Sequence, residues 1–328
     1  MFTLKNAKLI KGYLFVIASA FIFGCMPLMA KFIYAEGVNS MSLVFLRNTL
    51  AIPMLGIIVV AQKGSLKVQP KALLPISAIA IMGCCLTPVL LFTSYNYIAS
   101  GTATVFHFVY PAVVVLAGFL FLKKKMQIGT LLSVILCVVG IALFYDPNEP
   151  INFMGGAFAL LSGFTYATYV VLLSIFKHKD ISGFRFSFFI TVVSALAMLI
   201  VCLVSGNLTF PTSITGWLLC LLFAFSLNVG AVVLFQQGTF LIGGERASIL
   251  STVEPITSIV AGAVIFHETI GFRTAIGSVL VILASLLIAL FDMKTSKAEV
   301  KKLIPGGLVR RGFSCSKKTR CSASGLFN

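Results

Sequence analysis

The stretch Tyr95–Lys124 occurs twice in this chain, and the repeat constrains the fold more than any other feature of the sequence. Pro111 in the first copy corresponds to Pro255 in the second, a separation of 144 residues. Internal repeats of this kind fix the architecture, so the chain is expected to fold as two similar halves. The same separation, without a gap, aligns Ala103 with Ala247, Val109 with Val253, Ala117 with Ala261, Gly118 with Gly262, Gly12 with Gly156, Leu28 with Leu172, Phe32 with Phe176 and Thr130 with Thr274.

The composition is too apolar for a protein that folds in water. Of the 328 residues, 59% are hydrophobic and 10% are charged, whereas soluble domains have about 45–50% and about 25%. A helix needs about 20 apolar residues to cross a bilayer core of about 30 Å. The first apolar run lacks the cleavage site of a signal peptide, so we expect it to remain as a span. Ten segments qualify, at approximately 12–33, 41–61, 72–95, 101–122, 127–145, 154–176, 185–205, 214–237, 246–267 and 272–291.

Lysine and arginine in the connecting loops predict the orientation of these spans. Thirteen of them fall on one face of the membrane, whereas the opposite face has at most two, both at span ends. Both termini are therefore expected in the cytoplasm, and the net charge of +16 reflects topology and a basic tail rather than nucleic-acid binding. The thirteen are Lys5, Lys8, Lys11, Lys63, Lys67, Lys71, Lys123, Lys124, Lys125, Lys177, Lys179, Arg185 and Arg246, and the two are Lys31 and Arg273.

Five spans in each copy is an odd number, so the second copy must enter the membrane upside down. The sequence therefore predicts an all-α integral membrane protein with ten transmembrane helices in two inverted five-helix repeats. Inverted repeats are typical of transporters, in which two opposed halves expose a central site to each side in turn; a duplicated channel or structural protein is the alternative. The predicted parts are a cytoplasmic N-terminus (1–11), a first repeat (12–146), a second repeat (154–291) and a basic, disordered cytoplasmic tail (292–328), of which 303–328 is left unassigned to the native fold.

Several local patterns resemble the EamA-type transporters of the drug/metabolite transporter superfamily. The first span ends FGCMPLMAKF with Lys31, the second begins SLVFLRNTLA with Arg47, and the ninth reads ASILSTVEPITSIVAGAVIFHE with Glu268 at its end. The first copy departs from the pattern, because Lys124 stands where the second copy has Glu268. The resemblance covers residues 12–291 and implies the ten-helix fold and the transport of small organic solutes, without naming the solute.

Ionisable groups deep in a span cost on the order of 3 kcal/mol and indicate function unless a neighbouring helix pairs them. Glu254 lies about eight residues inside its span, and its repeat-related position is Tyr110, one helical turn from His107. Glu254 is predicted to bind a cationic group of the substrate or to carry a coupling proton. Further candidates for the lining of a central cavity are Tyr110, His107, Tyr166, Tyr169 and Asn228. Neutral polar residues in spans often only join helices.

Two other groups of residues have candidate roles. Lys31 and Arg47 near the outer ends of the first two spans predict an anion-attracting outer vestibule, together with Glu36, unless they simply extend to the interface. Proline removes a backbone hydrogen bond inside a helix and bends it. The candidate kinks, either beside the pathway or fixed by packing, are at Pro27, Pro111 and Pro255.

The sequence has no pattern of an enzyme, a metal site or a cofactor site. It has no H-E-x-x-H, no phosphate-binding loop and no G-x-S-x-G motif, and its cysteines follow no metal-binding spacing. We therefore predict a secondary active transporter of the bacterial inner or plasma membrane, which works by alternating access, with export of amino acids or related metabolites as the leading hypothesis. Uptake of a nucleotide-like cofactor or a sugar on the same fold, or a non-transporting sensor or membrane-embedded enzyme, are the alternatives. A coupling proton or cation and a homodimer are left open.

Overall fold

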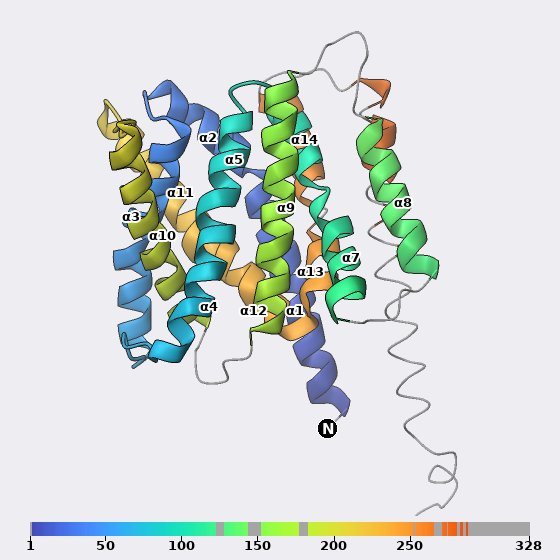
Figure 1. Ribbon diagram of the computed structural model, residues 1–328, viewed down its shortest axis with the longest axis horizontal. Helices are drawn as coiled ribbons and strands as arrows, with labels where there is room; N and C mark the ends of the chain where they lie inside the picture. The colour runs from blue at the N-terminus through green and yellow to red at the C-terminus, as the bar shows by residue number, and fades with distance from the viewer. Residues whose placement is uncertain are drawn as a thin grey trace, which may run out of the picture. The chain divides into compact units, whose positions relative to one another are not determined.

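The computed structural model describes residues 2–122, 128–143, 152–176, 183–251, 253–265, 271–273, 275–280, 283, 284 and 287. Helices connected by turns and short loops make up these residues, and none of them forms a strand. The helices, two of them π-helical and named η (Figure 1), are α1 (Phe2–Gly24), α2 (Met26–Ala35), α3 (Ser40–Ala61), α4 (Pro70–Ala80), η1 (Ile81–Leu86), α5 (Thr87–Ser94), α6 (Ser100–His107), α7 (Tyr110–Leu122), α8 (Ile128–Ala142), α9 (Phe153–Ile175), α10 (Gly183–Ser205), α11 (Ile214–Ala224), η2 (Phe225–Ala231), α12 (Val232–Ile242), α13 (Gly244–Leu250) and α14 (Val253–Ile265).

Eight stretches of the described helices are long and apolar enough to cross a membrane, which confirms the prediction of an all-α membrane protein. They coincide with the first four predicted segments and with the sixth to the ninth. The fifth segment corresponds to α8, with a shorter apolar stretch at Leu131–Gly140. The eight are Lys8–Ala35, Ser40–Ala61, Pro70–Ser94, Ser100–Leu120, Phe153–Ile175, Gly183–Ser205, Ile214–Ile242 and Gly244–Ile265.

Some predicted features lie outside the described residues. Only parts of the tenth predicted segment are described. The remaining features outside the description are the tail 292–328, Glu268, and the basic positions Lys123, Lys124, Lys125, Lys177 and Lys179.

The backbone repeats its irregularities at the separation found in the sequence. The two π-helical segments, η1 and η2, begin at Ile81 and Phe225, which are 144 residues apart. The fourth span is interrupted between α6 and α7, and the ninth span is interrupted at the equivalent place between α13 and α14. A π-helix or a break inside a span needs a local cause, so its recurrence at the same register shows that the two halves share one architecture.

Helices of one half pack against helices of the other half. α1 packs against α12, and the repeat-related helices α9 and α5 also pack against each other. α3 packs against α10, its own counterpart in the second half. α1 begins at the lower end of the bundle in Figure 1 and α9 begins at the upper end, so these equivalent helices run in opposite directions. The arrangement is that of two inverted repeats related by a pseudo-two-fold axis.

Glycines at equivalent helix crossings allow close contact between helices in both halves. A side chain at Gly12 would lie 2.5 Å from the side chain of Ile242, and one at Gly155 would lie 2.9 Å from the side chain of Ile98. Ile98 and Ile242 are repeat-related positions, and Gly155 is next to the counterpart of Gly12. Small residues at these crossings let the helices approach closely, as helix packing in membranes requires.

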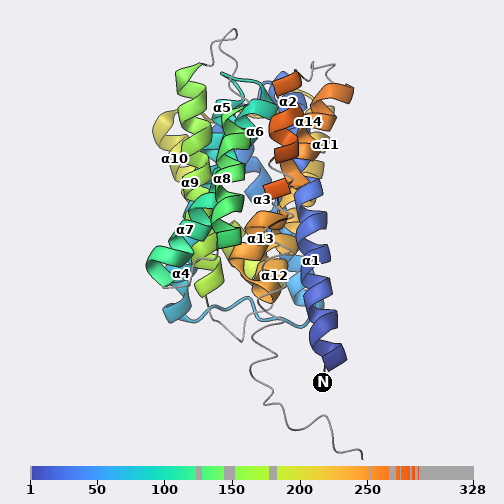
Figure 2. The same cartoon turned by 90° about the vertical axis from the view of Figure 1, so that its right-hand side faces the viewer.

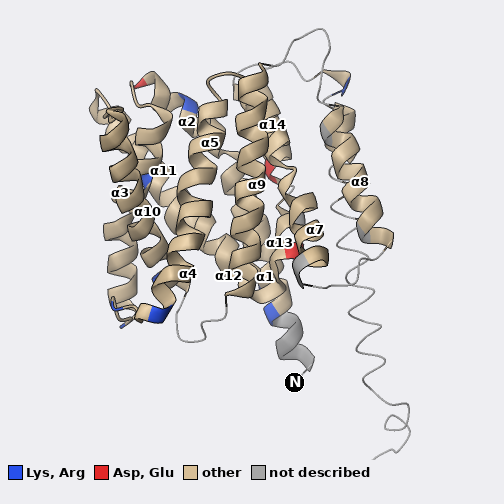
Figure 3. Ribbon diagram, viewed as in Figure 1, with Lys and Arg blue, Asp and Glu red and all other residues tan. Residues whose placement is uncertain are grey.

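The distribution of side chains fits a protein surrounded by lipid. Large apolar side chains face outward, such as Leu74, Val204 and Ile214, which are 80%, 85% and 82% exposed. Charged residues gather mainly at the two ends of the bundle (Figure 3). We call the end at which α1 begins and the loop 62–69 lies the basic end, and it includes Lys8, Lys11, Lys63, Lys67 and Lys71.

Candidate functional site

The two interrupted spans place their breaks at the centre of the bundle (Figure 2). Pro111 is the second residue of α7, and Pro255 is the third residue of α14. Proline cannot donate the backbone hydrogen bond to the preceding turn, and it disfavours helical geometry in the residue before it. Each break thus follows from the repeated proline, and each puts the preceding residue, Tyr110 or Glu254, in the first turn of a new helix.

Glu254 is a buried carboxylic acid whose side chain has no polar partner in the described part of the chain. Its side chain is 5% exposed, and the carboxylate has no hydrogen bond or ion pair among the described residues. It lies in the first turn of α14, where the helix dipole favours a negative charge. Because an unpaired carboxylate in a membrane is costly, this position is available to a charged ligand.

A cavity lies at the contact between the two repeats. Its narrow interior leaves about 40 Å³ for the centres of water molecules, which is room for roughly three waters. Residues of both halves line it, so a movement of one half against the other would change its size. The lining consists of Phe23, Met26, Arg47, Gly83, Cys84, Thr87, Pro88, Leu91, His107, Tyr166, Tyr169, Val232 and Glu254.

Arg47 is part of this lining rather than of an outer vestibule. Its side chain is 3% exposed, and its Nε has no hydrogen-bond partner within the described ranges. Its Cζ lies 5.8 Å from the ring centroid of Phe92, a cation–π distance. None of the described residues supplies a carboxylate partner for it, and it does not pair with Glu254. One cation and one carboxylate therefore face the same cavity without neutralising each other directly.

His107 lines the cavity and is hydrogen-bonded to α9. Its Nδ1 lies 2.8 Å from the hydroxyl of Ser162, and that hydroxyl donates to the carbonyl of Ala159 at 2.6 Å. Because the hydroxyl proton is already used, Nδ1 must be the donor, and Nε2 of a neutral imidazole is then an acceptor. Gly163 allows this approach, since a side chain there would lie 2.5 Å from the carbonyl oxygen of His107.

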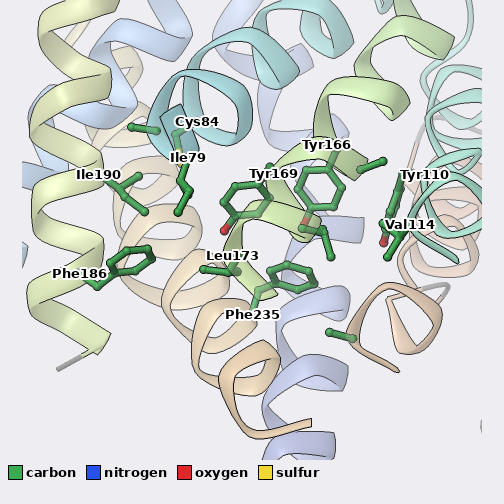
Figure 4. Packing of buried hydrophobic residues seen from close by; sticks show 14 of the residues in the cluster. Ile79, Cys84, Tyr110, Val114, Tyr166, Tyr169, Leu173, Phe186, Ile190 and Phe235 are labelled. Atoms are coloured by element: carbon green, nitrogen blue, oxygen red, sulfur yellow. The ribbon is translucent and has the colours of Figure 1, made fainter. Parts of the chain in front are cut away.

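Aromatic rings surround the site on the side of α9. Figure 4 shows Tyr166 between Tyr169 and Tyr110, with Phe235 below. The ring centroids of Tyr166 and Tyr110 are 4.7 Å apart in an edge-on arrangement, and those of Tyr166 and Tyr169 are 5.3 Å apart. Tyr110 is buried in this cluster beside the cavity and is not in the lining itself. The rings form an apolar wall with phenol groups, suited to the uncharged part of a small metabolite.

Asn228 lies in a hydrogen-bonded connection between the two π-helices instead of in the cavity lining. Its Nδ2 donates to Oδ1 of Asn48 at 2.9 Å, and Nδ2 of Asn48 donates to the carbonyl of Cys84 at 3.3 Å. Asn228 belongs to η2 and Cys84 to η1, at repeat-related positions. The side chain of Asn48 thus joins the two halves where their backbones depart from α-helix.

The remaining predicted residues lie around the cavity or away from it. Pro27 is buried near the start of α2, after the helix is interrupted at Cys25, and the neighbouring Met26 lines the cavity. Lys31 is half-buried in α2 and is not in the lining. The carboxylate of Glu36 accepts a hydrogen bond from Ser213 at 2.5 Å, at the end of the bundle opposite the basic end.

Gly83, Thr87 and Thr165 are among the residues in or beside the lining that the sequence did not single out. A side chain at Gly83 would lie 2.2 Å from the ring of Tyr169, so this glycine makes the space for that ring. The hydroxyls of Thr87 and Thr165 lie 2.8 Å apart and connect α5 to α9 beside the cavity. Glycine and threonine recur in most spans as packing residues, so their types gave no signal here.

The chain is similar to known families and proteins over most of its length. The profile described as the EamA-like transporter family matches residues 10–145 and 153–290, one match for each repeat. An uncharacterized transporter of Clostridium kluyveri is 21% identical over 290 residues, covering 84% of this chain and 92% of that protein. The uncharacterized transporter YcbK of Bacillus subtilis is 25% identical over 279 residues, covering 81% and 88%.

Two further proteins match this chain, one over about half of its length and one over most of it. An uncharacterized transporter of Archaeoglobus fulgidus is 30% identical over 172 residues, 51% of this chain, and the match spans 58% of that relative. A solved crystal structure superposes with a TM-score of 0.68 at 14% sequence identity, covering 87% of this chain and 98% of that chain. The structural match supports the fold alone.

Proposed function

Because the chain belongs to the EamA-like transporter family, we propose that it is a secondary transporter for small zwitterionic metabolites, with amino acids as the leading class. The family match makes it a membrane transporter. The substrate, the alternating-access mechanism and the direction of transport are our proposal.

One observation carries the proposal. Arg47 and Glu254 both face one buried cavity and are not paired with each other. The planar guanidinium of arginine binds carboxylates with two parallel hydrogen bonds, and a carboxylate is the natural partner of an ammonium group. A molecule with both groups would neutralise both residues, whereas a simple amine or a simple acid would leave one of them unpaired in a medium where unpaired charges are costly.

The neutral residues of the site fit the same substrate. Nε2 of His107 offers a second acceptor for an ammonium group, since Nδ1 is held by Ser162. Tyr166 and Tyr169 offer a largely apolar wall for a side chain. The cavity holds only roughly three waters, so a metabolite enters only if the two halves move apart.

The connection between the halves at one end fits such a movement. At the end opposite the basic end, the loop after α2 is hydrogen-bonded to the loop after α10. The backbone N–H of Asn39 donates to Thr209 Oγ1 at 2.9 Å, and the Asn39 amide donates to the carbonyl of Asn207 at 2.7 Å. The first loop belongs to the first repeat and the second loop to the second repeat. Opening toward this end would break these bonds, while opening toward the basic end would keep them.

Export from the cytoplasm is the direction we propose, with the basic end and both termini in the cytoplasm of a bacterial cell and the substrate gradient or a coupling proton as the driving force. The loop lysines support this orientation by the positive-inside rule. A strain without the transporter should become sensitive to the accumulated substrate. A requirement for external supply of the same compound would instead favour uptake.

Counterflow into liposomes tests the substrate class. Purified protein is reconstituted, and the liposomes are loaded with one member of a matched set: an amino acid, the amine that lacks its carboxylate, the acid that lacks its ammonium group, a sugar and a nucleotide. We expect exchange with the zwitterions and at most a few per cent of that rate with the other four. Equal exchange of the amine and the amino acid, or exchange of the sugar alone, would overturn the zwitterion proposal.

A further inference from the structure

A second hollow lies on the outer surface of the bundle, between α3 and α10 and close to the basic end. It has a volume of about 570 Å³ and an apolar lining. Its outer wall includes Ile57, which is 70% exposed, and Val60, which is 59% exposed. On a span of a membrane protein such side chains face lipid, so this hollow opens to the hydrocarbon layer.

Its shape results from residues of both repeats. Gly56 has no side chain, and a Cβ there would lie 3.4 Å from the ring of Phe188 on α10, so the ring forms the floor of the hollow. Leu66, in the loop after α3, closes the hollow at the basic end. Arg185 of α10 donates a hydrogen bond to the carbonyl of Lys67 and thereby holds this loop over the hollow.

Exposed lysines lie directly beside the closed end. Lys63 and Lys67 flank Leu66 in the loop, and both are exposed. Lys63 has a φ of 55°, which is the left-handed conformation and, among the described residues, the single positive φ outside glycine. The N–H of Lys63 bonds to the carbonyl of Val60 at 2.9 Å, and the N–H of Gly64 bonds to that of Val59 at 2.8 Å.

These two bonds end α3 in a Schellman motif, with Lys63 at the position where glycine is usual. A left-handed lysine costs conformational energy that glycine would avoid. A positive charge is therefore present beside the hollow although lysine makes the local backbone conformation less favourable than glycine would.

The repeat provides an internal comparison. At the other end of the α3–α10 contact, the position related to Gly56 is Ile200 and the position related to Phe188 is Val44. The loop there, residues 206–213, has no lysine or arginine. The glycine and the positive charges are therefore present at one end of this helix pair and replaced at the related end, so neither follows from the shared architecture.

We infer that this hollow binds one anionic phospholipid, with an acyl chain between α3 and α10 and the phosphate headgroup at Lys63 and Lys67. The apolar lining fits a hydrocarbon chain, and basic residues at the membrane surface attract anionic headgroups. The lipid would touch both repeats. Its binding is independent of the solute that the central cavity takes, so it is tested without any transport assay.

Native mass spectrometry of the detergent-purified protein measures this binding directly. Phosphatidylglycerol is compared with phosphatidylcholine of the same acyl chains. We expect Lys63→Gly to weaken phosphatidylglycerol binding about fivefold, and Lys63→Gln with Lys67→Gln to weaken it about 25-fold, with little change for phosphatidylcholine. Gly56→Leu should fill the hollow and weaken the binding of both lipids.

Lys63→Gly separates a lipid site from a structural role. Glycine suits the left-handed position, so the melting temperature without added lipid should stay the same or rise while lipid affinity falls. Lys8→Gln with Lys11→Gln removes the same number of charges from the basic end and should leave affinity unchanged. If Lys63→Gly binds phosphatidylglycerol like the wild type, or if the two double variants lose affinity equally, there is no specific lipid site here.

Discussion

The two interrupted spans have the same backbone and different chemistry. In the fourth span the residues at the break are His107 and Tyr110, and in the ninth span the related residues are Ser251 and Glu254. The prolines that cause the breaks are conserved between the halves of this chain, while the side chains beside them are not. The shared part places an equivalent break in each of two inverted halves, and we propose that the part that differs provides the binding chemistry.

The same division applies to the cation of the cavity. Arg47 comes from the first repeat, and its related position in the second repeat is Thr191, a buried neutral residue. Each charged residue of the cavity thus has an uncharged counterpart, and each repeat supplies one of the two charges. Two carboxylates or two guanidinium groups at symmetric positions would repel each other, whereas this arrangement places opposite charges in one cavity.

The largest effect is expected from the pair at the breaks. Glu254→Gln removes the charge that we assign to ammonium binding, and it should lower transport efficiency about 100-fold. Tyr110→Phe removes only a hydroxyl from the aromatic cluster and should change it less than about threefold. Counterflow rates at several substrate concentrations measure both.

Glu245→Gln is the control for the first pair, because Glu245 lies in the first turn of α13 and outside the cavity lining. It should transport like the wild type. If Glu254→Gln also transports like the wild type, or if Tyr110→Phe is the more harmful change, the assignment of the charge to the second repeat is wrong.

Arg47 and Thr191 give the second comparison. Arg47→Lys keeps the charge and loses the bidentate geometry, so we expect about a tenfold higher KM. Thr191→Val, at the related position, should be nearly neutral. The loss in Arg47→Lys should disappear for the amine that lacks the carboxylate, because arginine then has no partner to lose. An equal loss for the amine and the amino acid would contradict carboxylate binding by Arg47.

The sequence predicts those parts of the structure in which a residue type by itself changes the backbone or is rare in a span. Pro111 and Pro255 change the backbone wherever they occur, and the breaks lie beside them. Glu254 and His107 were recognisable because ionisable groups are rare in spans, and both line the cavity. The π-helices had no such signal, since the segments IMGCCL and FSLNVGA share neither a proline nor a common pattern.

Arg47 shows why position along a span is not enough. Counting residues from the start of the second span put it near the outer end and grouped it with Lys31. Its direction depends on the packing of α3 against α10 and α5, which turns the guanidinium toward Phe92 and the cavity. Gly83 is a similar case, because its role is to leave space for Tyr169, and an absent side chain gives no pattern.

A smaller effect is expected from Ser162, which positions His107 and does not line the cavity. Ser162→Ala removes the acceptor of the Nδ1 proton, so transport should fall about fivefold. In ¹⁵N spectra of labelled histidine, the imidazole should change from the single Nδ1–H form to a mixture of tautomers.

Ser226→Ala is the matched control for Ser162→Ala, because Ser226 is exposed and donates to the carbonyl of Leu222 in the same span at 2.7 Å. It should leave both the spectrum and the transport rate unchanged. An unchanged histidine spectrum in Ser162→Ala would show that the hydroxyl does not set the tautomer, whatever happens to the rate.

The smallest effect is expected from the link between the π-helices, because single hydrogen bonds between membrane helices contribute about 0.6 kcal/mol. Asn228→Ala removes one bond, so it should lower stability by about that amount and leave KM unchanged. Asn48→Ala should cost more, since Asn48 also donates to the carbonyls of Val44 and Cys84. Unfolding in a denaturing detergent, with the double variant, measures the coupling between the two residues. If the two changes are simply additive, the two side chains are not coupled and the link does not join the halves. If Asn228→Ala raises KM as much as Arg47→Lys does, Asn228 belongs with the binding chemistry rather than with the shared framework of the two halves.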